Sequence, residues 1–320
     1  MVQVLRETTS EYDYFVGQIL SGVTKRMGER YTARIYKVMK NNSLELDSLV
    51  LLKEGKNFAP NIYLHPYFEA YQQGVVLSEL VNRLCSIYQD CNTPIVDDKF
   101  QYSFEEMKSH IIYRLVSYER NRKLLENIPH IRYLDLAITY HCLVREDEEG
   151  IGTIRITNEH RKQWKVQLKE LHELAADNTK RLFPVSIRSM EEVIRSMLMD
   201  EMSGKEEELS VEMNLFVENS TNAEHRMYIL TNEKGINGAS CLLYPNVLSE
   251  FAERFQSDFY LFPSSIHEVI LVPAQDQKSS REYAEMVHEI NATQVAKEEV
   301  LSDRVYFYSR EKGLEVNDYE

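Results

Sequence analysis

The stretch that most constrains the fold is MYILTNEKGINGASCLLYPNVLSEFAERFQSDFYLFPSSIHEVILVP, at residues 227–273. Two short apolar runs, at residues 228–231 and 239–243, flank the turn-forming segment KGING, so we predict two strands there. Pro245 opens a segment whose apolar residues recur at helical spacing, and two further strands are predicted around Pro263. The predicted order is β-β-α-β-β, which describes a sheet with a helix laid across one face.

The rest of the chain mixes helical and strand patterns without a regular β-α-β alternation. Residues 10–27 carry apolar side chains at helical spacing, and residues 31–39 and 44–52 alternate across Asn41-Asn42 as a hairpin does. We predict an α+β fold in which antiparallel hairpin-plus-helix units pack around mixed sheets. Other predicted helices cover residues 67–73, 76–88, 104–114, 118–126, 168–182 and 189–202, with one more capped by Asn158, and other predicted strands cover residues 61–64, 133–144 and 153–157.

Two segments suggest boundaries within the chain. Residues 92–98 (NTPIVDD) have neither a helical nor a strand period, and residues 203–211 (SGKEEELSV) are polar and charged. We predict an N-terminal α+β unit at residues 1–95, a central α+β unit at 96–203 that packs with the first, and a C-terminal α+β unit at 211–320. A similar strand-to-helix pattern begins at Ile62, Ile154 and Cys241. The three segments are either diverged copies of one hairpin-plus-helix unit or independent examples of common strand-to-helix signals.

Charge and hydropathy exclude several classes of partner. The chain has 320 residues and a net charge of -14, from 51 acidic and 37 basic residues, which disfavours phosphate backbones and anionic membranes. Local basic clusters such as Arg114 to Lys123 are nearly all interrupted by acids and are interpreted as solvated helix faces. No apolar run approaches the roughly 20 residues that span a bilayer, and the first residues show no signal-peptide pattern. We therefore expect a cytoplasmic protein that binds neither nucleic acid nor membrane, and its oligomeric state stays open.

Cofactor and metal motifs are missing from the sequence. The chain has 11 glycines, about half of what an average usage of about 7% would give, and neither GxGxxG nor GxxxxGK[ST] occurs. No HExxH motif occurs, and the spacing of Cys85 and Cys91 matches no common zinc or redox pair. We predict no cofactor, no metal, and four reduced cysteines that are not paired with one another.

The polar residues most suggestive of chemistry are Ser264, Ser265, His267 and Glu268 in LFPSSIHEVILVP. A serine near a histidine and a carboxylate suggests a nucleophile with its base, but the GxSxG elbow is absent. If residues 265–272 form a strand, His267 and Glu268 face opposite sides. The alternative is a structural turn in which the serines bond backbone groups.

Two hypotheses about function remain. The first is a non-enzymatic interaction or accessory protein, which binds another protein through sheet edges and a surface rich in the chain's 20 tyrosines. The second is a hydrolase-like enzyme with a site at the turn from Pro263 to Glu268 and a distant partner. Candidates for that partner are His141, His160 and Asp303. We favour the first and assign no catalytic residue.

Several segments together resemble an uncharacterised bacterial family, the domain of unknown function 5688. The resemblance rests on the stretch from residue 227 and on four further segments: NNSLELDSLVLLKEGKNFAPNIYLHPYFEAYQQG from Asn41, YERNRKLLENIPHIRYLDLAITYHCLV from Tyr118, NTKRLFPVSIRSMEEV from Asn178 and INATQVAKEEVLSDRVYFYSRE from Ile290. A weaker similarity, in IYLHPYFEAY and GASCLLYP, is to the domain of unknown function 1444. The resemblance implies a bacterial cytosolic protein and supplies no site residues.

Overall fold

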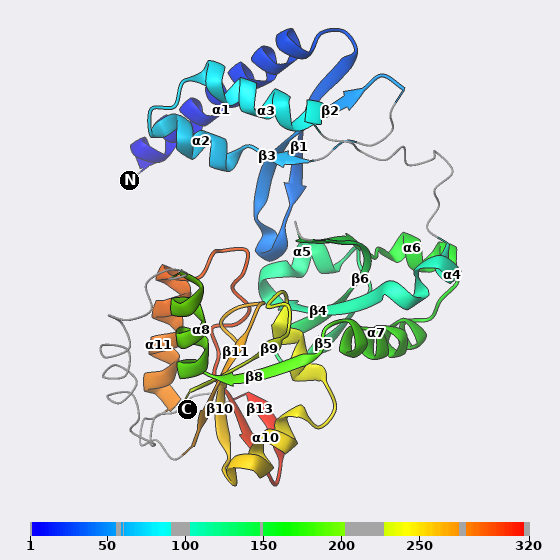
Figure 1. The fold of residues 1–320 in the computed structure, drawn as a ribbon, viewed down its shortest axis with the longest axis vertical. Coiled ribbons are helices and arrows are strands. Elements are labelled where there is room, and N and C mark those ends of the chain that lie inside the picture. The colour runs from blue at the N-terminus through cyan, green and yellow to red at the C-terminus, as the bar shows by residue number, and fades with distance from the viewer. Residues whose placement is uncertain are drawn as a thin grey trace. The chain divides into compact units, whose positions relative to one another are not determined.

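The chain forms two compact units (Figure 1), the first made of Met1–Lys40 with Leu44–Tyr102 and the second of Asn41–Ser43 with Ser103–Glu320. The computed structural model describes residues 2–55, 59, 61–90, 103–147, 150–201, 227–274 and 280–316. The two predicted boundary segments, at 92–98 and 203–211, lie outside these residues. Both units combine helices with antiparallel sheets, so the predicted α+β class is confirmed. The three-unit division stays a prediction.

The first unit is a three-stranded antiparallel sheet covered by three helices. Its elements are α1 (Val2–Met27), β1 (Tyr31–Met39), β2 (Glu45–Lys53), β3 (Ile62–Tyr63), α2 (His65–Gln72) and α3 (Leu77–Asp90), with strand order β1-β2-β3. The predicted hairpin is confirmed, because Tyr31 pairs with Lys53 and Met39 with Glu45. Its core is the apolar stripe of α1 packed on one face of β2. That stripe is fully buried at Phe15, Ile19 and Val23.

The second unit contains a four-stranded sheet built on one long central strand. β6 (Leu136–Asp147) pairs with β4 (Ile111–Ser117), β5 (His130–Tyr133) and β7 (Gly150–Arg155), all antiparallel. The helix α7 (Leu168–Leu182) packs on this sheet, and the Thr179 hydroxyl accepts a hydrogen bond from the edge amide of Tyr113 at 3.0 Å. Short helical segments complete this part: α4 (Phe104–Met107), η2 (Lys108–His110), η3 (Glu119–Asn121), α5 (Arg122–Leu125) and α6 (Asn158–Trp164).

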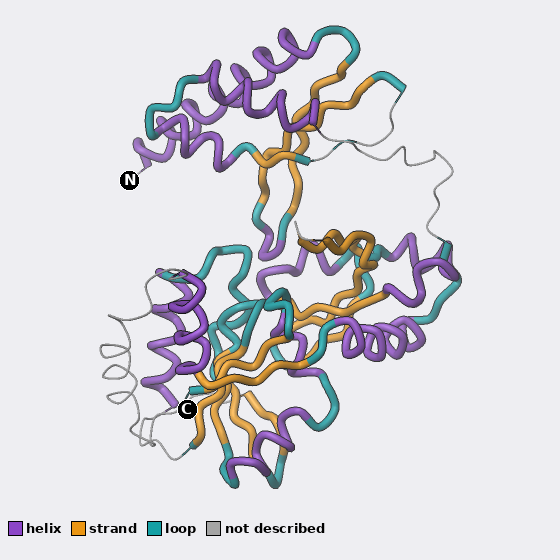
Figure 2. Tube along the Cα trace, in the orientation of Figure 1, coloured by secondary structure: helices purple, strands orange, loops and turns teal. Residues whose placement is uncertain are grey.

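A six-stranded antiparallel sheet forms the rest of the second unit, with strand order β13-β12-β10-β11-β9-β8. Its elements are β8 (Val185–Ser189), α8 (Met190–Glu201), β9 (Tyr228–Asn232), η5 (Gly238–Leu243), α10 (Val247–Phe255), β10 (Phe259–Phe262), β11 (Val269–Pro273), α11 (Ser280–Thr293), β12 (Tyr306–Ser309) and β13 (Gly313–Val316). In Figures 1 and 2, α8 and α11 lie together on one side of this sheet. Phe262 packs against Tyr283 of α11, whereas Phe259 packs against Phe251 of α10, so the sheet is covered on both faces.

Four sequence-based predictions of local structure were wrong. The predicted helix at 104–114 ends early, and its last residues begin β4, because the apolar run from Ile111 is buried on both faces and carries no helical period. The segment 118–126 holds only two short helical turns. Residues 239–243 form the 3-10 helix η5 rather than a strand, so the third strand-to-helix segment lacks its strand. Thr157 caps α6 in place of Asn158.

The tyrosines of the described strands range from buried to exposed. Tyr140, Tyr228 and Tyr306 are buried, whereas Tyr36 in β1 is 45% exposed. Tyr31, Tyr63 and Tyr260 are partly exposed, and the tyrosine-rich surface expected for partner binding stays a prediction. Within the described ranges, no helix is both long and apolar enough to cross a bilayer.

Candidate functional site

The turn between β10 and β11 joins two parts of the second unit through its backbone. Ser264 and Ser265 are buried, and the backbone carbonyl of Ser264 accepts a hydrogen bond from Leu301 at 2.9 Å. Pro263 accepts another from Ser302 at 2.9 Å. The Ser265 hydroxyl accepts a hydrogen bond from the His267 amide at 3.0 Å, as expected of a serine that stabilises a turn. The predicted strand begins only at Val269, so the residues before it do not alternate as a strand would.

Both ring nitrogens of His267 have partners that orient the imidazole. The amide of Asn237 donates a hydrogen bond to Nδ1 at 3.3 Å, and Nε2 lies 3.4 Å from Oε1 of Glu299. A neutral imidazole has one N–H group, so the Asn237 contact places its proton on Nε2, where it faces the carboxylate. In this arrangement neither nitrogen offers a lone pair to the Ser265 hydroxyl. Burial, with the negative charge of Glu299, raises the pKa of Glu268.

The three distant residues considered as catalytic partners lie in separate environments. His141 is buried in β6, and its burial and then the charges of Arg114 and Arg155 hold its pKa well below the usual value. His160 accepts a hydrogen bond from the Thr157 amide in the capping box of α6. Among the described residues, no hydrogen bond joins His141, His160 or Asp303 to Ser265 or His267. Asp303 does line a cavity.

This cavity is polar and has a volume of about 380 Å³. It lies in the second unit, beside the ends of β4 and β5. Residues 302–304, which continue the segment hydrogen-bonded to the Pro263 turn, line it as well. Three arginines and three acids line it: Arg120, Arg132, Arg304, Glu119, Asp135 and Asp303. Three separate stretches of the chain supply its charged and polar wall, and a fourth contributes Val316.

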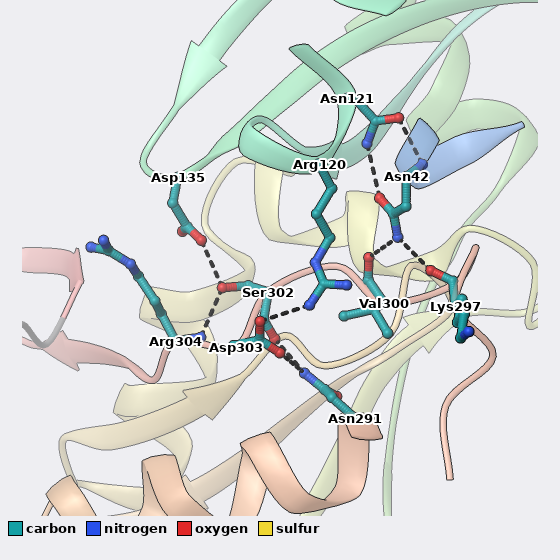
Figure 3. Close-up of polar contacts among 10 residues, drawn as sticks. All are labelled: Asn42, Arg120, Asn121, Asp135, Asn291, Lys297, Val300, Ser302, Asp303 and Arg304. Carbon is teal, nitrogen blue, oxygen red and sulfur yellow. Dashed lines mark hydrogen bonds and ion pairs between the residues drawn. The ribbon is translucent and has the colours of Figure 1, made fainter. Parts of the chain in front are cut away.

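Two of the cavity's acids are held by hydrogen bonds from the protein itself (Figure 3). Asp303 accepts one from Asn291 Nδ2 at 2.8 Å and one from Arg120 Nη2 at 2.8 Å. Burial disfavours the charged carboxylate, but the hydrogen bonds from Asn291 and Arg120 outweigh it and lower the pKa of Asp303. The side chain is therefore an ionised anchor that fixes Arg120.

Asp135 accepts hydrogen bonds from the Ser302 hydroxyl at 2.7 Å and from the Tyr306 hydroxyl. Burial and the nearby charge of Asp135 raise the pKa of Tyr306 well above its usual value, so the phenol stays protonated and remains a donor. The Ser302 oxygen in turn accepts a hydrogen bond from the Arg304 amide at 2.9 Å. This chain of contacts fixes the backbone from which the Arg304 side chain extends (Figure 3).

The exposed rim of the cavity is rich in guanidinium groups. Arg132 lies with its guanidinium carbon 4.7 Å from the ring centroid of Tyr118, and its Nε donates to the carbonyl of Leu134 at 3.3 Å. Glu119 pairs with Arg122 at 2.6 Å. The hydrogen bond from Arg122, together with the charges of Arg122, Arg132 and Arg304, lowers the pKa of Glu119.

Residues from an early part of the chain tie the wall of the cavity together. Asn42, which has a φ of 58°, donates from its amide to Oδ1 of Asn121 at 2.8 Å. Its side-chain nitrogen donates to the carbonyls of Lys297 at 2.8 Å and Val300 at 2.6 Å (Figure 3). Ser43 donates to the Arg120 carbonyl at 2.6 Å. The sequence predicted Asn41-Asn42 only as a turn, so this clamp was missed.

Planar guanidinium groups are suited to bind carboxylate or phosphate oxygens by paired hydrogen bonds. The cavity lining contains no histidine and no cysteine. Within the part of the chain that the structure describes, no cluster of three or more histidine, cysteine or acidic side chains could hold a metal ion. The lining therefore combines three guanidinium groups that could bind an anion with three carboxylates.

Comparison with known proteins gives the family of this chain. Residues 12–310 match a family of unknown function, DUF5688, and the chain belongs to it. The similarity to the domain of unknown function 1444 is not shown and stays a prediction. No curated protein and no solved structure matches the chain.

Proposed function

We propose that this member of the family is a cytoplasmic bacterial protein that binds a protein partner and has no catalytic activity of its own. The partner places a carboxylate in the cavity lined by Arg120, Arg132 and Arg304. One observation carries the proposal: three arginines line one cavity in a chain whose net charge is -14, and two of the three carboxylates beside them already have an arginine partner.

The overall acidity of the chain does not prevent an acidic segment from binding there. At physiological ionic strength the Debye length is about 8 Å, so charges elsewhere on the surface are largely screened at the cavity. Two of the three carboxylates that line the cavity are already paired with an arginine, Asp303 with Arg120 and Glu119 with Arg122. A carboxylate that accepts paired hydrogen bonds from a guanidinium gains more than a simple point-charge contact would give.

The state of the other polar groups also supports binding rather than chemistry. The Ser302 hydroxyl donates to Asp135 and accepts from the Arg304 amide, so it already has partners within the protein in both roles. Asp303 is ionised and anchors Arg120, which leaves it no proton to donate near neutral pH. A hydrolase built on Ser265 and His267 stays a prediction, and no described contact joins the Ser265 hydroxyl to the imidazole ring.

The test is affinity capture from a lysate of the source cells, in parallel with three forms of the full chain. These are the wild type, the cavity variant Arg132→Gln/Arg304→Gln, and the control variant Arg188→Gln/Arg254→Gln. The control arginines are exposed, lie in the second unit and do not line the cavity, so both variants carry the same charge change.

We expect one protein to be retained equally by the wild type and the control, and at least about tenfold less by the cavity variant. Each lost charge-assisted hydrogen bond weakens binding by about 1.5–3 kcal/mol, and 1.4 kcal/mol is tenfold in affinity. Equal retention by all three forms, at matched melting temperatures, contradicts the proposal. A partner retained through apolar contacts alone, with no dependence on salt, also contradicts it.

A further inference from the structure

A second, much smaller cavity in the second unit has an unusual wall. Its volume is about 10 Å³, and residues of β4, α7 and η5 line it, among them Arg114, Thr179 and Ser240. Two polar atoms of this wall are buried without any hydrogen-bond partner among the described residues, Nε of Arg114 and Oγ of Ser240. Buried polar atoms are nearly always paired, so two orphans at one cavity need an explanation.

The surroundings of this cavity are positively charged. Arg114 forms no ion pair with any described carboxylate, and none of the described residues that line the cavity is acidic. Burial, and then the charge of Arg155, lowers the pKa of Arg114 to about 10, so the guanidinium is still charged at neutral pH. A buried charge without a counter-charge is costly, and a bound anion removes that cost.

Two other polar side chains of the wall already have partners. The Thr179 hydroxyl donates to the carbonyl of Ala175 at 2.5 Å, and Asn232 Nδ2 donates to the carbonyl of Ile236 at 2.9 Å. Arg114 Nε and Ser240 Oγ differ from these groups, because they are buried without a partner among the described residues. An arginine Nε–H is a donor only, and a serine hydroxyl rotates to donate wherever an acceptor lies.

We propose that this cavity binds a monatomic anion, chloride, held by the Nε–H of Arg114 and the hydroxyl of Ser240. A volume of about 10 Å³ suits one small ion and is small for phosphate, sulfate or a carboxylate. A water molecule fits the space but leaves the positive charge of Arg114 uncompensated. The anion is a structural ligand of the second unit and is separate from the partner-binding cavity.

The first test replaces chloride in solution by gluconate, which is too large for the cavity, at constant ionic strength. We expect the melting temperature of the second unit, followed by the fluorescence of Trp164, to rise in chloride by at least about 2 °C and to saturate. Arg114→Met is expected to abolish the chloride dependence. Arg188→Met, at an exposed arginine of the same unit, is expected to keep it.

The second test does not depend on any variant folding correctly. Crystals of the wild type soaked in bromide are expected to show an anomalous peak between Arg114 Nε and Ser240 Oγ, and Ser240→Ala is expected to weaken it. Identical melting temperatures in chloride and gluconate overturn the proposal. Electron density at this position without an anomalous signal also overturns it, because it identifies a water molecule.

Discussion

Adding a single methyl group at Gly238 is expected to destabilise the second unit by about 2–6 kcal/mol. A Cβ atom there would lie 2.0 Å from Thr231 Oγ1, 2.4 Å from the His267 carbonyl oxygen and 2.8 Å from the Asn232 amide nitrogen. Two of these atoms are backbone, and the third donates a hydrogen bond to the His267 carbonyl at 2.8 Å. Overpacking costs about 1–3 kcal/mol and a broken buried hydrogen bond about 1–3 kcal/mol more.

The assay is urea unfolding of Gly238→Ala, followed through the fluorescence of Trp164, the chain's only tryptophan. Trp164 lies in α6 of the second unit, so its signal reports on the unit that holds the substitution. The expected result is a lower midpoint with an unchanged denaturant slope, since the unfolded state is the same.

The matched control for this substitution is Gly235→Ala. Gly235 has a φ of 65° and open space where a Cβ atom would lie, so its substitution costs only the backbone strain of about 1–2 kcal/mol. If Gly238→Ala costs no more than Gly235→Ala, the close approach of the backbone at Gly238 is not a constraint on the fold and the reasoning is refuted.

Three further predictions follow from single residues. Ser265→Ala is expected to cost about 0.5–2 kcal/mol in urea unfolding, because the variant loses the oxygen that accepts a hydrogen bond from the His267 amide. His267→Gln is expected to leave partner capture unchanged. A variant at either residue with unchanged stability and a lost cellular activity would instead favour the hydrolase. Asp303 has a lowered pKa, so its charge stabilises the fold above the unfolded pKa of about 3.9, and this stability is lost as the pH falls through the folded pKa. The difference in melting temperature between the wild type and Asp303→Asn should thus be largest near pH 7 and vanish in acid. Thiol titration of the denatured protein without reductant is expected to find four free thiols, and stoichiometric zinc would contradict this.

The spacing of apolar residues predicted helices and strands well where one face of the helix or strand is exposed to solvent. The α1 stripe and the β1–β2 hairpin follow directly from apolar spacing. The same reasoning failed at Ile111-Ile112, because a strand buried on both faces loses its alternation and cannot be told from a helix. It failed again at residues 239–243, where the tight approach at Gly238 rather than strand pairing buries an apolar run.

The cavity could not be predicted, because its wall comes from four stretches that are distant in sequence. Arg120 belongs to the basic run whose sequence predicts a solvated helix face. In the structure Arg120 follows the buried strand β4 and donates a hydrogen bond to Asp303. Asp303 was considered only as a partner of His267. The usable signal was Arg132 in β5 and Asp135 in the β5–β6 turn, where charged residues interrupt an otherwise apolar hairpin.

The most direct test of the partner-binding cavity is photo-crosslinking in the source cells from a photoreactive amino acid at Val316, which lines the cavity. The account predicts one covalent adduct with a protein, attached through an Asp- or Glu-rich peptide, that disappears in Arg132→Gln/Arg304→Gln. The same photoreactive group at Val185, exposed on the edge strand β8, is expected to give no such adduct. An adduct at Val316 that survives the loss of both arginines, or the absence of any protein adduct there, contradicts the account.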